Sequence, residues 1–183
     1  MEAFLKAFLL IILFLCTHAY AEAAQVSVKN MDTCFSPRED CAQKLISVLN
    51  IAEKTLDIAI FSITHSDITN AIIAAKERGV VVRVVVDKAQ AGGSKSKTKE
   101  LIAAHIPVKI GKASGGTMHD KFSIVDGMML QTGSFNYSMS AANNNTENQI
   151  YIADKDAIQR YQEDFEILWN DGSPKSNPAS LGD

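Results

Sequence analysis

Hydrophobic residues recur along the chain with two different spacings. A spacing of two, or an unbroken β-branched run such as 80–86, predicts strands, and spacings of three and four, as in 41–52, predict helices. Asp126-Gly127 lies between two such strands and predicts a two-residue hairpin turn. The pattern therefore predicts strands at 25–29, 56–60, 80–86, 108–110, 118–125, 128–133 and 150–153, and helices at 37–52, 66–78 and 154–169, with a short helix just before 108.

The order of these elements predicts one α/β domain. Strands alternate with helices up to residue 110 and a hairpin follows, which is typical of a mixed sheet covered by helices. The apolar run 80–86 is typical of a strand covered on both faces, as in parallel sheets. We therefore expect a mixed, largely parallel β-sheet flanked by helices, formed by a single domain at 22–170. The Gly-, Pro- and Ser-rich stretch 171–183 is predicted to be a flexible tail.

The first twenty-one residues have the pattern of a secretory signal peptide. Lys6 precedes ten apolar residues, fewer than the roughly 20 that cross a bilayer, and Ala19-Tyr20-Ala21 supplies the small residues of a cleavage site. We expect cleavage after Ala21, with positions 23 and 24 as alternatives. The mature protein would then be periplasmic or secreted, without stable membrane association. The segment before the apolar run carries little positive charge for a signal peptide, so an uncleaved membrane anchor stays an alternative.

An exported chain would keep two cysteines, Cys34 and Cys41. We expect them to form one disulfide that closes a short loop, because oxidising compartments favour such bonds. The alternative is two reduced thiols, one of them packed as a small hydrophobic group. Between them, the segment 36–39 reads Ser-Pro-Arg-Glu, a capping box with proline at the first helical position. This segment therefore predicts the start of the first helix.

Charge is distributed unevenly. The formal net charge of −3 argues against a uniformly basic nucleic-acid-binding protein. Yet the stretch 76–112 has a net charge of +6, and 147–183 has −5. A basic stretch suits a polyanionic partner, although it is also what an ordinary solvated face looks like. Lys95, Lys97 and Lys99 lie in a predicted loop and are the candidates for nucleic-acid contact.

One strand and the turn after its partner hold the candidate chemistry. His119 and Lys121 are two residues apart, so both side chains leave the same face of a strand. An ammonium beside an imidazole suits an anionic substrate, because the lysine neutralises charge while the histidine attacks or moves a proton. Ser134 and Asn136 can offer a hydroxyl and an amide to phosphate oxygens. Glu147 could hold the second histidine nitrogen.

The spacing of these residues resembles the HKD motif of the phospholipase D superfamily, element by element: His119-x-Lys121-x(4)-Asp126-x(6)-Gly133-Ser134-x-Asn136. The segment 74–82 is similar to the superfamily's helix-to-strand segment, and Glu147 falls where its smaller members keep a glutamate. With an export signal and a single motif, the chain is similar to the small bacterial periplasmic endonucleases of that superfamily. The resemblance implies a phospholipase D-like fold and a phosphodiesterase that needs neither metal nor cofactor.

The resemblance also implies roles for the site residues. His119 would attack phosphorus to form a phosphohistidine, while a second histidine protonates the leaving oxygen. One chain offers one such histidine, since His65 and His105 have no lysine two residues later and are expected to pack or lie at the surface. The resemblance therefore implies a homodimer whose motifs meet at a twofold interface. By the same resemblance, Lys121, Asn136 and Ser134 would bind the phosphate. Glu147 would orient His119. Asp126 would complete the motif, in either a catalytic or a structural role.

We therefore expect a metal-independent, non-specific endonuclease acting on DNA in the first place, or on RNA. A phospholipase D-type lipid phosphodiesterase is the nearest alternative, because the motif does not distinguish the two substrates. A catalytically silent DNA-binding module is a third, against which the intact motif argues. The aromatic residues Tyr161, Phe165 and Trp169 are predicted to form the inner face of the last helix rather than a base-stacking platform.

Overall fold

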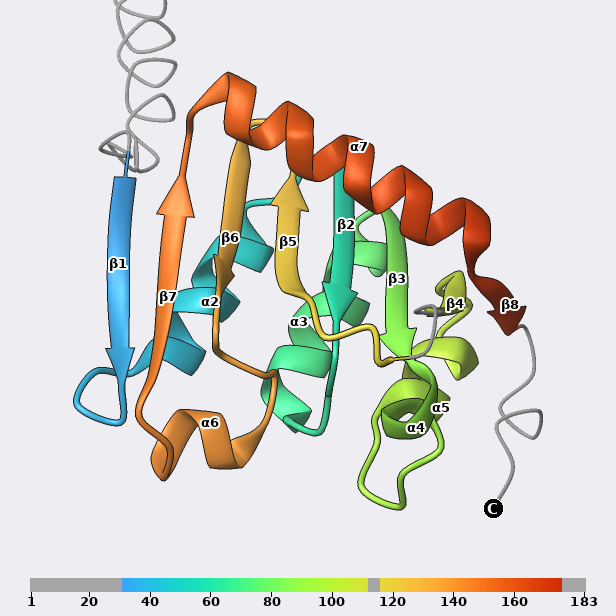
Figure 1. Ribbon diagram of the computed structural model, residues 1–183, viewed down its shortest axis with the longest axis horizontal. Helices are drawn as coiled ribbons and strands as arrows, with labels where there is room; N and C mark the ends of the chain where they lie inside the picture. Colours follow the sequence, from blue (N-terminus) through green and yellow to red (C-terminus); the bar gives the residue numbers. More distant parts are fainter. Residues whose placement is uncertain (1–30, 112–115, 176–183) are drawn as a thin grey trace, which may run out of the picture.

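The computed structural model describes residues 31–111 and 116–175. They form an eight-stranded sheet in the order β1-β7-β6-β5-β2-β3-β4-β8 (Figure 1). The signal-like segment 1–21 and the strand predicted at 25–29 lie outside the described residues. The strands are β1 (Met31–Ser36), β2 (Thr55–Ile60), β3 (Val81–Asp87), β4 (Val108–Gly111), β5 (Lys121–Val125), β6 (Met129–Gly133), β7 (Glu147–Ile152) and β8 (Ser173–Lys175). The helices are α2 (Cys41–Asn50), α3 (Ser66–Glu77), α4 (Lys88–Ala91), α5 (Thr98–Ala103), α6 (Met139–Asn143) and α7 (Lys155–Asp171).

The pairing of the strands confirms a mixed α/β sheet but corrects its expected character. Only β2 with β3 and β3 with β4 are parallel, and the other five neighbouring pairs in the described sheet are antiparallel. The prediction of a largely parallel sheet is therefore wrong. Parallel neighbours need a long crossover, and α3 and α5 supply one only between β2, β3 and β4. A hairpin joins β5 to β6, and the short α6 lies between β6 and β7. Both connections reverse the chain direction, so these neighbouring strands are antiparallel.

Helices cover both faces of the sheet. In Figure 1, α7 crosses one face while α2 and α3 lie behind the other. Phe122 and Phe165 are buried in the core under α7, and Tyr161 and Trp169 pack against that core partly buried. The predicted inner face of the last helix is therefore confirmed. Among the described residues, no helix is both long and apolar enough to cross a membrane.

The start of the described chain differs from the prediction. Ser36 ends β1, where it pairs with Glu147 and donates its hydroxyl to the carbonyl of Ala141 at 2.7 Å. The N-cap of α2 is instead Asp40, whose carboxylate accepts the N–H of Gln43 at 3.0 Å. The capping box predicted at 36–39 is therefore wrong, because Ser36, its first residue, pairs with β7 as the end of a strand. The predicted disulfide between Cys34 and Cys41 is present and links β1 to α2.

The C-terminal boundary also moves. Helix α7 reaches Asp171, and Ser173–Lys175 pair with β4 as the edge strand β8. The flexible tail predicted from residue 171 was therefore placed too early, since 171–175 belong to regular elements. Residues 176–183 lie outside the described residues. The described strands, from β1 to β8, form one continuous sheet.

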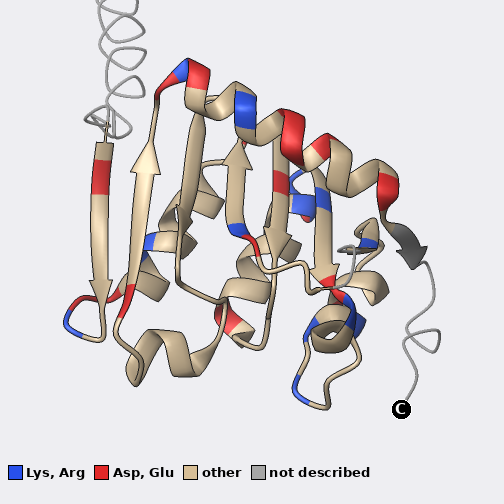
Figure 2. Ribbon diagram, in the orientation of Figure 1, with Lys and Arg blue, Asp and Glu red and all other residues tan. Residues whose placement is uncertain are grey.

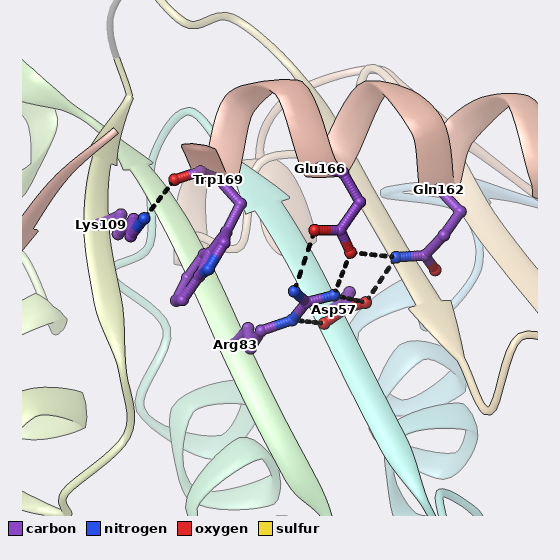
Figure 3. Close-up of polar contacts among 6 residues, drawn as sticks. All are labelled: Asp57, Arg83, Lys109, Gln162, Glu166 and Trp169. Atoms are coloured by element: carbon purple, nitrogen blue, oxygen red, sulfur yellow. Dashed lines mark hydrogen bonds and ion pairs between the residues drawn. The ribbon is translucent and has the colours of Figure 1, made fainter. Parts of the chain in front are cut away.

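A partly buried polar cluster attaches α7 to the sheet (Figure 3). Arg83 of β3 donates to both carboxylate oxygens of Asp57 on β2 at 2.7 Å, and also to both of Glu166 on α7, at 2.6 and 3.2 Å. Gln162 donates to Asp57 at 2.8 Å. The guanidinium also lies 4.8 Å from the ring centre of Phe165. The hydrogen bonds to Asp57 and Glu166 raise the pKa of Arg83, so its charge is permanent here.

Candidate active site

The end of β2 and the start of β5 meet at one edge of the sheet. Ile60 and Lys121 are register partners in the antiparallel pair, so the residues just beyond them, Phe61 and Asp120, are also brought together. The N–H of Phe61 donates to the carbonyl of Asp120 at 2.8 Å. His119 therefore lies in the chain that enters β5, beside the chain that leaves β2.

His119 and Lys121 form a contact pair, although the strand predicted at 118–125 begins only at Lys121, so the two residues do not share a strand face. The Lys121 ammonium lies 3.2 Å from Nδ1 of His119 and donates to the His119 carbonyl at 2.5 Å. Lys121 is 7% exposed, while His119 is exposed. Burial lowers the pKa of Lys121, and the nearby carboxylates of Asp120 and Glu147 oppose that shift. The arrangement places a desolvated cation beside an accessible imidazole, which suits attack on an anionic phosphodiester.

Phe61 contacts both His119 and Lys121, and it was not among the site residues predicted from the sequence. Its ring centre lies 4.5 Å from that of His119, and the Lys121 ammonium is 5.1 Å from the same ring. The aromatic ring therefore restricts the imidazole and shields the ammonium from water. An aromatic residue that ends an alternating strand is the only local signal for Phe61, and it gains meaning only once β2 is known to pair with β5.

The end of β6 supplies the second half of the motif. Gly133 has φ of +143°, and a Cβ there would collide with the backbone of Asn148 on β7, so glycine is required. Ser134 follows, and its hydroxyl donates to Glu147 at 2.5 Å and accepts the N–H of Asn148 at 3.1 Å. Asn136 is half-buried, and its Oδ1 forms no hydrogen bond within the described part of the chain. Such a polar group suits ligand binding.

Glu147 has different partners from those predicted. Its carboxylate accepts from the Ser134 hydroxyl and from the Asn145 amide, the latter at 2.9 Å. Asn145 is held in turn by Ser140, whose hydroxyl donates to its Oδ1 at 3.0 Å. Among the described residues, no hydrogen bond joins Glu147 to His119. The carboxylate lies close enough to act electrostatically on Lys121. The sequence could not predict this, because the contacts depend on how β6 and β7 pair.

Asp126 lies at the opposite end of β5 from His119, about 17 Å along the strand from Lys121. Its carboxylate accepts the N–H groups of Glu53, Lys54 and Thr55 at 2.7–3.0 Å. Burial would raise the pKa of Asp126, but these three hydrogen bonds hold it below its ordinary value. The structure therefore does not bring Asp126 to the other motif residues, and it supports the structural alternative for this aspartate.

The basic stretch 76–112 is not one surface (Figure 2). Arg78 donates to the carbonyls of Leu49 and Ala52, Arg83 belongs to the polar cluster under α7, and Lys109 donates to the Trp169 carbonyl at 2.5 Å. These three side chains serve packing. The predicted contact lysines are found in the segment that joins α4 to α5 and includes the start of α5: Lys95, Lys97 and Lys99.

That lysine-bearing segment is attached to the active-site edge. The N–H of Lys97 donates to the carbonyl of Ile63, two residues after Phe61, at 2.9 Å. Lys95 is exposed, whereas Lys97 pairs with Glu100 at 2.6 Å and so has part of its charge compensated. Lys95 is therefore better placed than Lys97 to meet a polyanion.

The other described histidines have structural positions. His65 is 6% exposed and is the N-cap of α3, since its Nδ1 accepts the N–H of Asp67 at 3.2 Å. His105 has φ of +56° in the turn before β4, at the end of that strand away from His119. Within residues 31–111 and 116–175, His119 is thus the one histidine in contact with a lysine ammonium, while His65, which follows β2, serves as a helix cap. In the same ranges, the one cluster of possible metal ligands is Cys34, Glu39 and Cys41, from which the disulfide removes both thiolates.

Comparison with known proteins agrees with this geometry. Residues 45–169 match the family model described as cardiolipin synthase, PLD-like domain. The chain is 33% identical over 145 residues to a mitochondrial cardiolipin hydrolase of Xenopus tropicalis, covering 79% of this chain and 69% of that protein. It is 34% identical over 146 residues to a phospholipase D of Rickettsia prowazekii, covering 80% and 71% of the two chains.

Two solved structures are similar over nearly their whole length. Nuc from Salmonella typhimurium, a phospholipase D family member, superposes with a TM-score of 0.75 at 28% identity, over 79% of this chain and 97% of that one. NucT from Helicobacter pylori gives 0.72 at 26% identity, over 79% and 98%. The fold, the motif geometry and these relatives lead to one conclusion: the chain belongs to the phospholipase D superfamily and is a hydrolase of phosphodiester bonds.

Proposed function

We propose that this protein is a metal-independent, non-specific endonuclease that cleaves DNA, and RNA by the same chemistry. The observation that carries the proposal is the attachment of the lysine-bearing segment to the edge that holds His119, through the hydrogen bond from Lys97 to Ile63. Sequence-independent binding of nucleic acid consists mostly of phosphate neutralisation. Lysines in a segment attached to this edge would supply that neutralisation close to the reacting histidine.

The proposed reaction has two steps. The free imidazole nitrogen of His119 forms a bond to phosphorus as the bond to the leaving oxygen breaks, and a second histidine gives that oxygen a proton. Water then attacks the phosphohistidine, loses its proton to the second histidine and releases His119. Lys121 and Asn136 bind the phosphate oxygens, while Ser134 and Asn145 hold Glu147 beside them.

The second histidine is proposed to come from a second copy of the chain. His65 is 6% exposed and caps α3 through its Nδ1, and His105 lies at the end of β4 away from His119, so both have structural positions. A twofold axis beside this edge would bring two His119 side chains together and give each the role of acid for the other. Sedimentation of the purified protein tests this arrangement, and a fully active monomer of about 18 kDa, scaled from the length left after cleavage, would refute it.

A plasmid-cleavage assay tests the proposed activity. We expect the wild-type protein to nick and linearise supercoiled DNA in excess EDTA, and the His119→Ala variant to lose at least about 1,000-fold in rate. The matched control is His105→Ala, which should keep full activity. Undiminished cleavage by His119→Ala would contradict the proposal, as would a loss in EDTA that divalent metal restores.

A lipid phosphodiesterase is the second candidate. The relatives named cardiolipin hydrolase and phospholipase D favour it, and so do two exposed apolar side chains at the ends of elements near this edge, Phe35 (41% exposed) and Met139 (52%). Parallel assays on cardiolipin and phosphatidylcholine vesicles distinguish the two substrates. Faster turnover of a lipid than of DNA would replace the nuclease proposal with this one.

We also propose that the protein is exported and that its signal is removed after Ala21. The disulfide between Cys34 and Cys41 supports an oxidising compartment. Sequencing the N-terminus of the mature protein from fractionated cells tests the proposal, and a chain that still begins at Met1 would contradict it.

A further inference from the structure

Asp87 is a buried carboxylate that the reaction described above does not use. It ends β3, is 3% exposed, and accepts three backbone N–H groups. One oxygen, Oδ1, accepts from Ala89 and Gln90 at 2.9 and 3.1 Å and so caps α4. The other, Oδ2, accepts from Met118 at 3.2 Å. Met118 directly precedes His119, so one side chain joins the start of the lysine-bearing region to the chain that enters the active site.

Met118 is also fixed from another direction. It is 2% exposed, and Gly111, the register partner of Asp87 on β4, lies directly against it. A Cβ at position 111 would be 2.8 Å from Cγ and 2.9 Å from Cβ of Met118. These are the inner atoms of the methionine side chain, so any residue larger than glycine would displace Met118. The backbone next to His119 is therefore held by a hydrogen bond and by close packing.

These contacts complete a closed set of three segments. The segment 118–120 is bonded to Phe61 through the Asp120 carbonyl, and the segment 61–63 is bonded to Lys97 through the Ile63 carbonyl. Asp87 closes the set by joining the region 87–97 back to Met118. Displacing any one of the three segments must therefore strain the other two.

We propose that Asp87 is a positioning residue that fixes the backbone of His119 through the Met118 N–H and couples it to the lysine-bearing segment. The coupling to nucleic acid rests on the proposed function, whereas the positioning of His119 applies to any phosphodiester substrate. Misplacing a reacting group by about 1 Å can cost on the order of 100-fold in rate. The expected signature is a lower kcat at nearly constant KM.

The Asp87→Asn variant tests the proposal selectively. Asparagine keeps an oxygen that can cap α4, but its NH₂ cannot accept the Met118 N–H. The matched control is Asp154→Asn, at the N-cap of α7, where the carboxylate accepts the single N–H of Ala157. Both variants are assayed on plasmid DNA, bis(p-nitrophenyl) phosphate and cardiolipin vesicles. For whichever substrate the wild type turns over, we expect Asp87→Asn to lower kcat about 10-fold to 100-fold and Asp154→Asn to leave it unchanged.

Gly111→Ala provides an independent route if Asp87→Asn does not fold. It pushes on Met118 without touching the carboxylate, and we expect it to lower kcat in the same way. Unchanged kcat in folded Asp87→Asn, or in Gly111→Ala when only that variant folds, would overturn the proposal. A loss of activity caused by a higher KM alone, with kcat unchanged, would also overturn it. If the wild type cleaves the chromogenic diester or lipid but not DNA, the nuclease proposal fails while the effect on kcat still tests Asp87.

Discussion

The two ends of β5 carry two parts of one sequence motif and have opposite properties. At the start, His119 is exposed and the buried Lys121 ammonium has its pKa lowered by burial. At the end, the Asp126 carboxylate is satisfied by three backbone N–H groups, and its pKa is held low. One end keeps its polar groups available for a substrate, and the other uses them to hold the fold together. A motif that reads as one unit thus serves two separate purposes.

Replacing Lys121 should have the largest effect, at the catalytic end alone. Lys121→Met keeps an apolar chain of similar length but removes the cation that would face the phosphate, so we expect kcat to fall about 100-fold to 1,000-fold. The unfolding midpoint should change little, because a partly desolvated charge is also removed. Steady-state kinetics and thermal unfolding measure both. Lys44→Met, which breaks the ion pair with Asp32 between β1 and α2, is the control and should leave kcat unchanged.

Replacing Asp126 should do the reverse. Asp126→Ala leaves three N–H groups without their acceptor, so we expect a loss of about 1 to 3 kcal/mol in the free energy of unfolding. The kcat of the folded protein should be unchanged well below the unfolding midpoint. Asp171→Ala, at the exposed end of α7, is the control and should not destabilise. A fall in kcat without loss of stability would show that both ends of β5 serve catalysis.

The stability that Asp126 contributes should also depend on pH in one direction. A carboxyl whose pKa is lower in the folded state stabilises the fold above its unfolded pKa, and this contribution disappears as the pH falls through the folded pKa. The difference in unfolding free energy between wild type and Asp126→Ala should therefore be constant near neutral pH and shrink below the ordinary value of 3.8. A difference that grows on acidification would contradict this assignment.

Asn145 should have a smaller effect, again at the catalytic end. Its amide holds one oxygen of Glu147, and one such hydrogen bond is worth about 1 kcal/mol, so Asn145→Ala should lower kcat about fivefold. The exposed neighbour Asn144 offers a matched control in Asn144→Ala, which should be silent. Equal effects of the two variants would indicate a change in the loop rather than in Glu147.

The smallest effect should come from the lysine-bearing segment. Lys95→Ala should reduce the salt dependence of DNA binding by about one unit of slope, with little change in kcat. Lys97→Ala should reduce it less, because Glu100 already compensates part of that charge. Binding titrations at several salt concentrations measure both slopes. Identical slopes for wild type and Lys95→Ala would remove this segment from the binding surface.

Local signals in the sequence were sufficient for the hairpin and for the pairing of catalytic side chains. Asp126-Gly127 takes positive φ at both residues, as the dipeptide predicts, but the loop has three residues, 126–128, rather than two, because Val125 pairs with Met129. His119 and Lys121 are in contact, although not on one strand face as predicted, since β5 begins only at Lys121. Each of these features depends on neighbours within a few residues. The start of the helix predicted at 154–169 is local in the same way, since Asp154 accepts the N–H of Ala157 and caps α7.

Long-range pairing determined what the sequence did not show. Ser36 reads as a helix cap, but pairing with β7 makes it the end of a strand. Phe61 is 58 positions from His119, and only the register of β2 with β5 brings their rings together. The partners of Glu147 likewise depend on β6 lying beside β7. No local spacing encodes these contacts.

The polar cluster under α7 has a consequence for the synthesis of the chain. Asp57 and Arg83 leave the ribosome long before Gln162 and Glu166, so the sheet is made before the helix that covers its charges. Arg83 already pairs with Asp57 inside the sheet, but a helix docked one residue out of register would take Gln162 away from Asp57 and Glu166 away from Arg83, and partly buried polar groups that lose partners are unfavourable. The cluster therefore favours one register of α7 on the sheet, and its polar groups gain their full set of partners only once that helix has been synthesised.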